Sequence, residues 1–377
     1  MSTIGILGGG QLARMLVLAG APLGARFEVV DTVPDACAGQ VASLLRADWR
    51  DVAALEKFAQ AIDVATFDFE NVPAETARWL AERVDVFPNP GALAVAQDRL
   101  AEKRMFREIG LGTADFAAVD DRAGLERAVA AIGLPAILKR RRLGYDGKGQ
   151  ALLRSTADVG PAWLALGDAP LILEAFVPFS RELSLVAVRS RGGEFRTWPL
   201  TRNWHHNGIL SASLAPAPDV ASVAAKAVEH ARALATRLDY VGVFALELFE
   251  CNGRLLGNEM APRVHNSGHW TIEGSECSQF ENHVRAVVGW PLGSTAPRGT
   301  SVMLNWIGEL PDRDPVLAEP FAHWHDYGKR ARAGRKVGHA TVCVNDPAEL
   351  AKALERIGRA LGREDQVAPV VAELRRA

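Results

Sequence analysis

A basic, glycine-rich stretch near the middle of the chain could hold an anion. Residues 138–150, LKRRRLGYDGKGQ, contain five cations, three glycines and one tyrosine in a chain of formal net charge -2. Lys148 is followed by Gly149 instead of the Ser or Thr of a P-loop, and the stretch joins two predicted strands instead of opening a helix. We expect a hairpin lid that wraps backbone amides and Lys148 around a triphosphate, with Lys139 reaching the same phosphates. The alternative is a solvated basic loop, and we interpret the arginines at 140–142 singly as surface charges.

Two glutamates in apolar surroundings could hold a metal ion. Glu247 lies within VGVFALELFE, and Glu259 lies on the strand that returns after CNG. A two-residue Asn-Gly turn would send the carboxylates to opposite faces, whereas a three-residue loop ending at Gly253 would put them on one face as diagonal neighbours. We favour the three-residue loop. Two such charges at about 7 Å would repel by about 2 kcal/mol, so Mg²⁺ bridging phosphate oxygens is the expected partner. A pair of salt bridges to arginines is the alternative.

A glycine turn opens the chain and allows three interpretations. Gly8, Gly10 and Ala13 match G-x-G-x-x-G/A between a predicted strand and helix, and Asp31 ends the next strand. Such a turn brings backbone amides and a helix N-terminus close to a phosphate, whichever molecule carries it. NAD(P), another phosphorylated ligand and a tight turn without ligand therefore all remain open at this point.

The elements that position these residues indicate a mixed α/β and α+β protein. Apolar strands that alternate with helical periodicity predict a Rossmann-like parallel sheet over residues 1–100. Short strands joined by glycine-rich or polar turns predict a small α+β domain over 101–181. Residues 182–377 begin with a hairpin through Gly192 and Gly193 and contain a helix at about 219–238.

Composition excludes several classes of protein. The chain has 377 residues, 48% of them hydrophobic, which predicts two or three domains with real cores. No apolar run reaches the roughly 18 residues of a membrane span, and the N-terminus lacks the pattern of a signal peptide, so we expect a cytoplasmic protein. The four cysteines are far apart and predict reduced thiols. The near-neutral charge gives no support for a nucleic-acid partner, and the lack of a long apolar run gives none for a membrane partner.

The order of these features resembles the ATP-grasp superfamily: a basic strand, a glycine lid, LEAFV, and an acidic strand pair ending in NEMAPR. More narrowly, GGGQLARML, FENVP, QDRLAEK, GYDGKGQ, NEMAPRVHNSGHWT and AGRKVGHATV are similar to the N5-carboxyaminoimidazole ribonucleotide synthases of purine biosynthesis. The similarity runs in order along nearly the whole chain. The first glycine motif alone is not specific, and Ala333 is a departure from the family pattern that should matter little.

The resemblance implies a fold, a reaction and a set of contacts. The fold is an ATP-grasp fold preceded by a Rossmann-like domain, and the reaction is the ATP-dependent carboxylation of aminoimidazole ribonucleotide by bicarbonate through carboxyphosphate. ATP and Mg²⁺ are the implied cofactors, with the metal on Glu247 and Glu259, and a homodimer is typical of the family. The residues implied to contact ATP are Arg99, Lys139, Gly144, Tyr145, Asp146, Gly147, Lys148, Gly149, Gln150, Glu174, Ala175, Phe176, Val177, Glu182, His205, Asn258 and Glu259.

The resemblance also implies two substrate sites. The residues implied to bind bicarbonate or carboxyphosphate are Arg263, His265, Asn266 and Ser267. The expected catalytic residues are Arg263, His265 and Tyr145. The residues implied to bind the ribonucleotide are Gln11, Glu70, Tyr145, Asp146, Lys329, Arg335 and Lys336. His323 and His325 suggest a metal pair, but without a third ligand we interpret them as structural. The alternatives to this function are a formate-using ATP-grasp ribonucleotide formyltransferase, and a dehydrogenase or nucleotide-binding protein read from the first turn.

Overall fold

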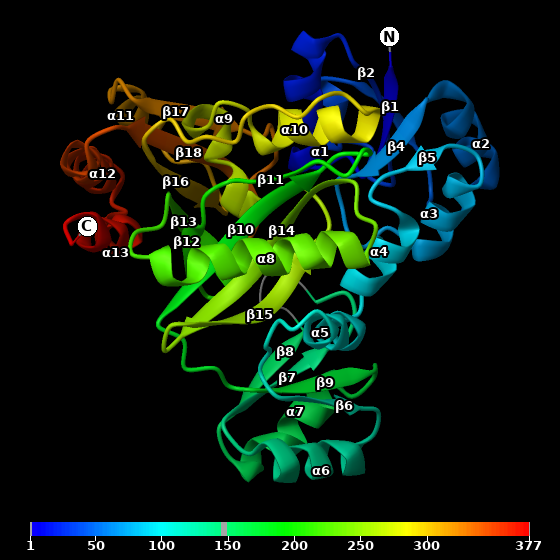
Figure 1. Ribbon diagram of the computed structural model, residues 1–377, viewed down its shortest axis with the longest axis vertical. Coiled ribbons are helices and arrows are strands. Elements are labelled where there is room, and N and C mark those ends of the chain that lie inside the picture. Colours follow the sequence, from blue (N-terminus) through cyan, green and yellow to red (C-terminus); the bar gives the residue numbers. More distant parts are fainter. Residues whose placement is uncertain (1, 145–148, 377) are drawn as a thin grey trace.

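The computed structural model describes residues 2–144 and 149–376, which form three β-sheets (Figure 1). Four residues that we expected to contact substrates, Tyr145, Asp146, Gly147 and Lys148, lie outside the described ranges. Within these ranges no helix is long and apolar enough to cross a membrane.

A parallel five-stranded sheet lies at the N-terminal end, with the strand order β3-β2-β1-β4-β5. Ile4 and Ile6 pack in a core with helix α1, whereas Leu7 packs in another with Phe58 of α2, so both faces of the sheet are covered. The predicted Rossmann-like sheet is therefore confirmed. Its elements are β1 (Thr3–Leu7), α1 (Gln11–Gly20), η1 (Ala21–Leu23), β2 (Arg26–Asp31), η2 (Cys37–Gln40), β3 (Ser43–Arg46), α2 (Val52–Ala61), β4 (Val64–Phe67), α3 (Ala74–Ala81), β5 (Asp85–Val86) and α4 (Pro90–Ala96).

A four-stranded antiparallel sheet projects from the rest of the molecule, at the bottom of Figure 1. Leu138 and Leu173 enter its core, so their strand neighbours Lys139 and Glu174 point to the opposite face. Helix α5 (Arg99–Glu108) precedes this sheet but packs against β15. The elements of the small sheet are β6 (Phe116–Val119), α6 (Arg122–Ile132), β7 (Ala136–Arg140), β8 (Gln150–Leu153), η3 (Thr156–Asp158), α7 (Val159–Leu166) and β9 (Leu171–Ala175).

The largest sheet is antiparallel and follows the order β15-β14-β10-β12-β13-β16-β18-β17, with β11 paired to β10. Its strands are β10 (Arg181–Arg189), β11 (Phe195–Thr197), β12 (Thr201–His206), β13 (Ile209–Ala215), β14 (Gly242–Cys251), β15 (Arg254–Ala261), β16 (Thr300–Ile307), β17 (Ala322–Asp326) and β18 (Lys336–Val344). The accompanying helices are α8 (Ala221–Arg237), η4 (Asn266–Gly268), α9 (Thr271–Gly274), α10 (Gln279–Val288), α11 (Asp314–Leu317), α12 (Pro347–Leu361) and α13 (Glu364–Leu374).

The two faces of this sheet have different roles. On β10, Leu183 and Leu185 pack in a core that includes α8, whereas Val186 packs in a core that includes α1 and α10. Ser184 shares the face of Val186 because side chains alternate along a strand. Ser184 also pairs directly with Glu247 of β14. The polar residues of the expected site therefore lie on the face opposite α8.

The β14–β15 hairpin corrects one prediction. Its turn has two residues, Asn252 and Gly253, both in the left-handed region at φ 50° and 72°, and Cys251 pairs with Arg254. The three-residue loop that we favoured is therefore wrong. The carboxylates nevertheless share a face, because a β-bulge at Asn258 shifts the register and places Glu247 directly opposite Glu259.

Candidate active site

The glycine turn is closed by carboxylates of the chain itself. Gly9 N–H donates to Asp31 Oδ2 at 2.6 Å, and Gly10 N–H donates to Asp68 Oδ2 at 2.5 Å. Ala13 N–H donates to Asp68 Oδ1 at 3.0 Å. These are amides that a dinucleotide pyrophosphate would use, so the geometry disfavours NAD(P) at this turn. Asp68 instead fixes the start of α1, where Gln11 is the first residue.

A buried lysine pair lies where the small sheet meets the large one. Lys139 Nζ is 3.0 Å from Glu174 Oε2, and Lys103 Nζ is 3.2 Å from the same oxygen. Lys103 also donates to the carbonyl of Gly257 on β15 at 3.2 Å. Burial opposes the charge of Glu174, but the cations Lys139, Lys103 and Arg99 outweigh it and lower the pKa of Glu174 to about 2. The arrangement holds Lys139 as a fixed cation facing the large sheet.

Lys103 was not predicted as a site residue, although the motif QDRLAEK contains it. Lys103 is 1% exposed and lies three residues from both Leu100 and Phe106, which are also buried on α5. That spacing was the available signal, because it places a lysine on the buried face of a helix. Glu102 was missed as well. Burial and the charge of Glu259 raise its pKa to about 8, and it accepts from Met260 N–H at 2.6 Å.

Arg99 connects the small-sheet side of the site to the expected metal ligands. Its Nη1 is 2.7 Å from Glu259 Oε2, and its Nη2 donates to the Gly144 carbonyl at 3.5 Å. Glu247, directly opposite Glu259, accepts from His265 Nε2 at 3.0 Å. Burial would raise the pKa of Glu247, but the hydrogen bond and the charges near it lower that pKa to about 2. Each carboxylate therefore already has a nitrogen partner.

These two carboxylates fit a magnesium site. They are hard oxygen ligands on one face, and they lie beside the cations expected to hold phosphates. Among the residues that the structure describes, no three His, Cys, Asp or Glu side chains form a metal cage. A divalent ion here would thus complete its coordination with phosphate or water oxygens, as Mg²⁺ commonly does.

The acid-substrate and ribonucleotide residues meet at the junction of the first and third sheets. Arg263 Nε forms a short charge-assisted hydrogen bond with Glu70 Oε2. Burial opposes ionisation of Glu70, but Arg263 outweighs it and lowers the pKa of Glu70. Lys329 Nζ donates to Gln11 Oε1 at 2.6 Å, which joins residues 318 positions apart. Two residues predicted for the ribonucleotide, Gln11 and Lys329, are therefore in contact.

Further predicted residues lie around this core. His205 Nδ1 is 2.7 Å from Glu182 Oε2; burial opposes protonation of His205, but Glu182 outweighs it and raises the pKa of His205. Burial and the charges of Arg335 and Lys336 lower the pKa of Lys329. The cations predicted for the 5′-phosphate are thus near enough to repel one another, which favours an anion between them.

Some predicted residues already form hydrogen bonds with other groups of the chain. Asn266 forms a two-way amide pair with Asn305, at 3.0 and 2.7 Å, and Asn305 was not anticipated. The amides of Ala175 and Phe176 donate to the carbonyls of Asp115 and Pro135 at 2.8 and 3.1 Å. An adenine at this segment would therefore use other backbone groups.

The remaining predicted positions lie on the strands and turns that border the site. Asn258 occupies the bulge next to Glu259. Gln150 begins β8 opposite Lys139, and the carbonyl of Gly149 accepts from Arg140 N–H at 2.8 Å. Val177 accepts from Phe179 N–H at 3.0 Å through its carbonyl.

The arginines 140–142, which we interpreted as surface charges, and His325 of β17 each pair with a carboxylate of the chain, whereas His323 is exposed. Arg141 and Arg142 both reach Asp98 Oδ2, at 2.7 and 3.3 Å. His325 Nε2 is 2.7 Å from Glu273 Oε1, and its ring stacks on His339 with centroids 4.2 Å apart.

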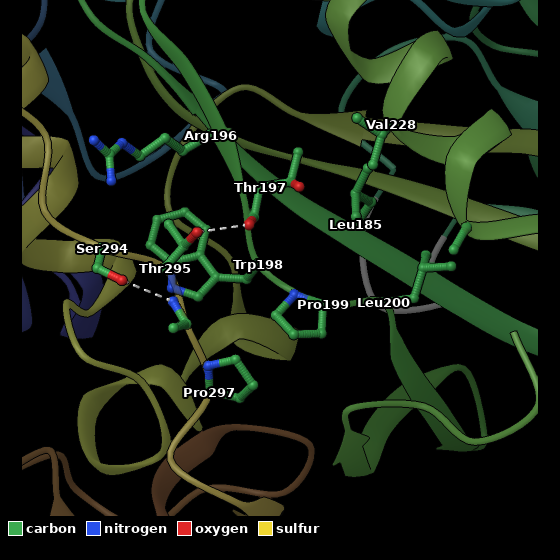
Figure 2. Close-up of a pocket in the computed structure, with 12 residues that line it drawn as sticks. Leu185, Arg196, Thr197, Trp198, Pro199, Leu200, Val228, Ser294, Thr295 and Pro297 are labelled. Carbon is green, nitrogen blue, oxygen red and sulfur yellow. Dashed lines mark hydrogen bonds between the residues drawn. The ribbon is translucent and has the colours of Figure 1, made fainter. Parts of the chain in front are cut away.

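A pocket of about 570 Å³ lies away from these residues, on the α8 face of the large sheet (Figure 2). Leu185, Trp198 and Val228 line it, and its only charged lining residue within the described chain is Arg196. Thr295 Oγ1 donates to the Thr197 carbonyl at 2.8 Å across the pocket wall. None of the predicted site residues lines this pocket, and we assign it no ligand.

Three family models match the chain in order. They are the ribonucleotide synthetase preATP-grasp domain at residues 1–97, the ATP-grasp domain at 104–280 and the phosphoribosylaminoimidazole carboxylase C-terminal domain at 301–353. The ATP-grasp fold predicted from the sequence is therefore confirmed.

Curated relatives are similar over most of their length. The N5-carboxyaminoimidazole ribonucleotide synthase of Pseudomonas aeruginosa is 55% identical over 347 residues, which span 92% of this chain and 96% of that protein. The Bacillus subtilis protein of the same name is 40% identical, over 90% of this chain and 91% of its own.

Solved structures agree with these relatives. The N5-carboxyaminoimidazole ribonucleotide synthetase of Thermus thermophilus superposes with a TM-score of 0.91 at 53% identity, covering 94% of this chain and 98% of that one. An Aspergillus clavatus synthase, solved in complex with ADP and 5-aminoimidazole ribonucleotide, superposes with a TM-score of 0.88 at 29% identity, covering 96% and 99%. The predicted resemblance is thereby confirmed, and the chain belongs to the N5-carboxyaminoimidazole ribonucleotide synthase family.

Proposed function

We propose that this chain carboxylates 5-aminoimidazole ribonucleotide with bicarbonate and ATP, giving N5-carboxyaminoimidazole ribonucleotide, ADP and phosphate in purine biosynthesis. One observation supports this assignment beyond family membership. Charged side chains that influence one another electrostatically lie in series, from Lys139 and Arg99 through Glu259 and Glu247 to His265 and the Arg263–Glu70 pair. The series would place a triphosphate, a small acid and an aminoimidazole side by side.

The chemistry explains why these three sites must adjoin. A bicarbonate oxygen attacks the γ-phosphorus of ATP, the bond to the ADP oxygen breaks, and carboxyphosphate forms. This anhydride breaks to CO2 and phosphate, and the amine of the ribonucleotide attacks the CO2 carbon and loses a proton. Water would destroy the intermediate, so the hairpin joining β7 and β8 would serve to exclude it.

The chain's own residues would align and neutralise the phosphates. Lys139, held by Glu174, and Arg99 would face the triphosphate, and Lys148 of the same hairpin would join them. Glu247 and Glu259 would hold Mg²⁺, which supplies charge neutralisation at the phosphate oxygens when bound. Glu182 and His205, which are hydrogen-bonded to each other, would lie at the ribose of ATP.

The acid and the ribonucleotide would bind on the side of the site that contains Arg263 and Glu70. Arg263 would bind the acid through its guanidinium, beside His265 and Ser267. Glu70 would accept from the amine of the ribonucleotide, and Tyr145 with Asp146 would close over it. Gln11, Lys329, Arg335 and Lys336 would hold its 5′-phosphate.

We also propose the organisation in which this activity operates. The chain would act in the cytoplasm as a homodimer. Its units would be residues 1–100, 101–181 and 182–377, the second moving as a lid during nucleotide exchange. Free Cys37, Cys251, Cys277 and Cys343 are compatible with a reducing compartment.

ADP release with each substrate omitted in turn tests the assignment. Release should require bicarbonate and should rise when 5-aminoimidazole ribonucleotide is added. ADP release that requires formate would favour the formyltransferase alternative. NADH binding without ADP release would favour the dehydrogenase alternative.

A further inference from the structure

A buried series of polar side chains leads to His265 through Ser267, and two of its members, Asn203 and Ser184, have no role in the function described above. Asn203 Nδ2 on β12 donates to Ser184 Oγ on β10 at 3.0 Å. Ser184 Oγ is 2.7 Å from Ser267 Oγ, which is 2.8 Å from His265 Nδ1. Ser184 and Ser267 are each 0% exposed, so solvent does not compete for their hydroxyl groups. Such a network is retained only when each member is satisfied.

The direction of these hydrogen bonds is fixed at the far end. Asn203 Nδ2 faces Ser184, and Asn203 Oδ1 accepts from the hydroxyl of Ser213 at 2.7 Å. An amide nitrogen can only donate, and Ser184 Oγ must therefore accept. The proton of Ser184 is then free to point at Ser267 Oγ. The proton of Ser267 in turn points at His265 Nδ1.

A second observation gives the same direction independently. The backbone N–H of Ser267 donates to His265 Nδ1 at 3.3 Å. A backbone N–H never accepts, so Nδ1 of this ring must offer its lone pair. The ring proton then lies on Nε2, the atom that is 3.0 Å from Glu247 Oε1.

We propose that Asn203, Ser184 and Ser267 are positioning residues that hold His265 in the tautomer with its proton on Nε2. The part of this inference that concerns substrate rests on the proposed function. The Nε2–H of His265 faces Glu247 in the substrate-free enzyme, and in that function it would donate to an oxygen of bicarbonate or carboxyphosphate, beside the guanidinium of Arg263. It holds the acid and does not take the proton of the reacting amine. The opposite tautomer would aim a lone pair at an anion and repel it.

The tautomer can be measured directly in the substrate-free enzyme. Nuclear magnetic resonance of the protein labelled with ¹³C and ¹⁵N in histidine distinguishes the two tautomers by the ring shifts, and His265→Asn assigns the signal by its disappearance. The proposal predicts a proton on Nε2 and a bare Nδ1. A proton on Nδ1 of the parent enzyme would overturn it, and this result needs no positioning variant to fold.

An isosteric variant should reverse the direction of these hydrogen bonds. Asn203→Asp offers only oxygens, so the hydroxyl of Ser184 must donate to it and can no longer donate to Ser267. The tautomer of His265 should shift toward Nδ1–H, and the KM for bicarbonate should rise roughly 5- to 10-fold with the KM for ATP within about twofold. Ser184→Ala should act in the same direction. If both variants fold and leave the tautomer and both KM values unchanged, the positioning role is wrong.

Ser301→Ala is the matched control. Ser301 is a fully buried serine of the same sheet, on β16, and its hydroxyl has no partner in the described part of the chain. Its loss should change neither the tautomer nor the bicarbonate KM, and a change equal to that of Ser184→Ala would overturn the proposal. If the enzyme does not consume bicarbonate but the proton is on Nε2, the proposed function fails while the positioning chain stands.

Discussion

At the scale of single residues, the site depends on charges that are paired before any substrate arrives. Glu259 is bonded to Arg99 and Glu247 to His265, and the two glutamates lie directly opposite each other on neighbouring strands. Like charges placed directly opposite destabilise a sheet unless cations compensate them. The salt-bridge alternative and the metal alternative are therefore compatible, since one describes the substrate-free enzyme and the other the loaded one.

We expect Glu247→Gln and Glu259→Gln each to keep the fold and to lower the rate of ADP formation by roughly 100-fold or more, because a charge that neutralises phosphate is lost while the shape is kept. Circular dichroism and thermal unfolding check the fold, and a coupled ADP assay checks the rate. Glu229→Gln, at an exposed position on α8, is the control. Parental rates in both site variants would make the two carboxylates structural.

Residue types in motifs were predictable, but their partners were not. Lys139, Arg263 and Lys329 were found because each follows a recognisable pattern. Their contacts to Glu174, Glu70 and Gln11 join distant segments, and a sequence gives no distances between such segments. Lys103 was missed because an isolated lysine on a basic helix is most often exposed, and only tertiary packing buries it.

At the scale of elements, the turn of the β14–β15 hairpin has a signal in the sequence, but its β-bulge does not. An Asn-Gly pair between apolar strands is a strong two-residue turn signal, and the structure forms that turn. The bulge at Asn258 has no comparable signal, and without it the carboxylates would lie on opposite faces. The parallel sheet was predictable because its strands and helices alternate with clear periods.

Glu174 and its partners Lys139 and Lys103 join the small sheet to the large one. Through Glu174, the free energy of unfolding should depend on pH. The pKa of Glu174 is lowered from 4.5 to about 2, so its contribution is present above the ordinary value and is lost as the pH falls toward about 2. Urea unfolding between about pH 5 and pH 2 should show a shallower fall in stability for Glu174→Gln than for the parent. Other paired carboxylates, including Glu247 and Glu70, should preserve part of the slope.

Glu174→Gln should also lower the free energy of unfolding by about 3 kcal/mol near neutral pH, because two buried lysines lose their charged partner. The pH dependence of the free energy of unfolding and its value at neutral pH are therefore separate measurements. Equal slopes in the parent and the variant would show that the cluster does not carry the acid sensitivity assigned to it.

At the scale of the whole molecule, the ribonucleotide end is built by segments from opposite ends of the chain. Gln40 Nε2 donates to the carbonyl of Gly328 at 3.0 Å, one position from Lys329. Gly328 has a φ of +67°, and a Cβ there would collide with the side-chain amide of Gln40. The backbone next to Lys329 is thus joined by a hydrogen bond to the N-terminal sheet domain, and a side chain at position 328 would displace the Gln40 amide that forms it.

Gly328→Ala should therefore displace Lys329 and raise the KM for 5-aminoimidazole ribonucleotide roughly tenfold, with the KM for ATP nearly unchanged. Steady-state kinetics with each substrate varied check this. Gly362→Ala, at the end of α12, is the control, because Gly362 also has a positive φ, 61°, but has open space where a Cβ would lie. An equal effect from both variants would show that backbone strain, and not the contact with Gln40, is responsible.

We expect this chain to transfer the carbon of bicarbonate to an amine at a site containing Arg263. Incubating the enzyme with ATP, Mg²⁺, 5-aminoimidazole ribonucleotide and ¹⁴C-bicarbonate tests this claim in one experiment. The label should appear on the nucleotide as an acid-labile carbamate, with one ADP per carbamate formed. Arg263→Ala should abolish incorporation and keep ATP binding, because its guanidinium is assigned to the acid. Full ADP release in bicarbonate-free buffer, or incorporation of labelled formate instead, would contradict the claim.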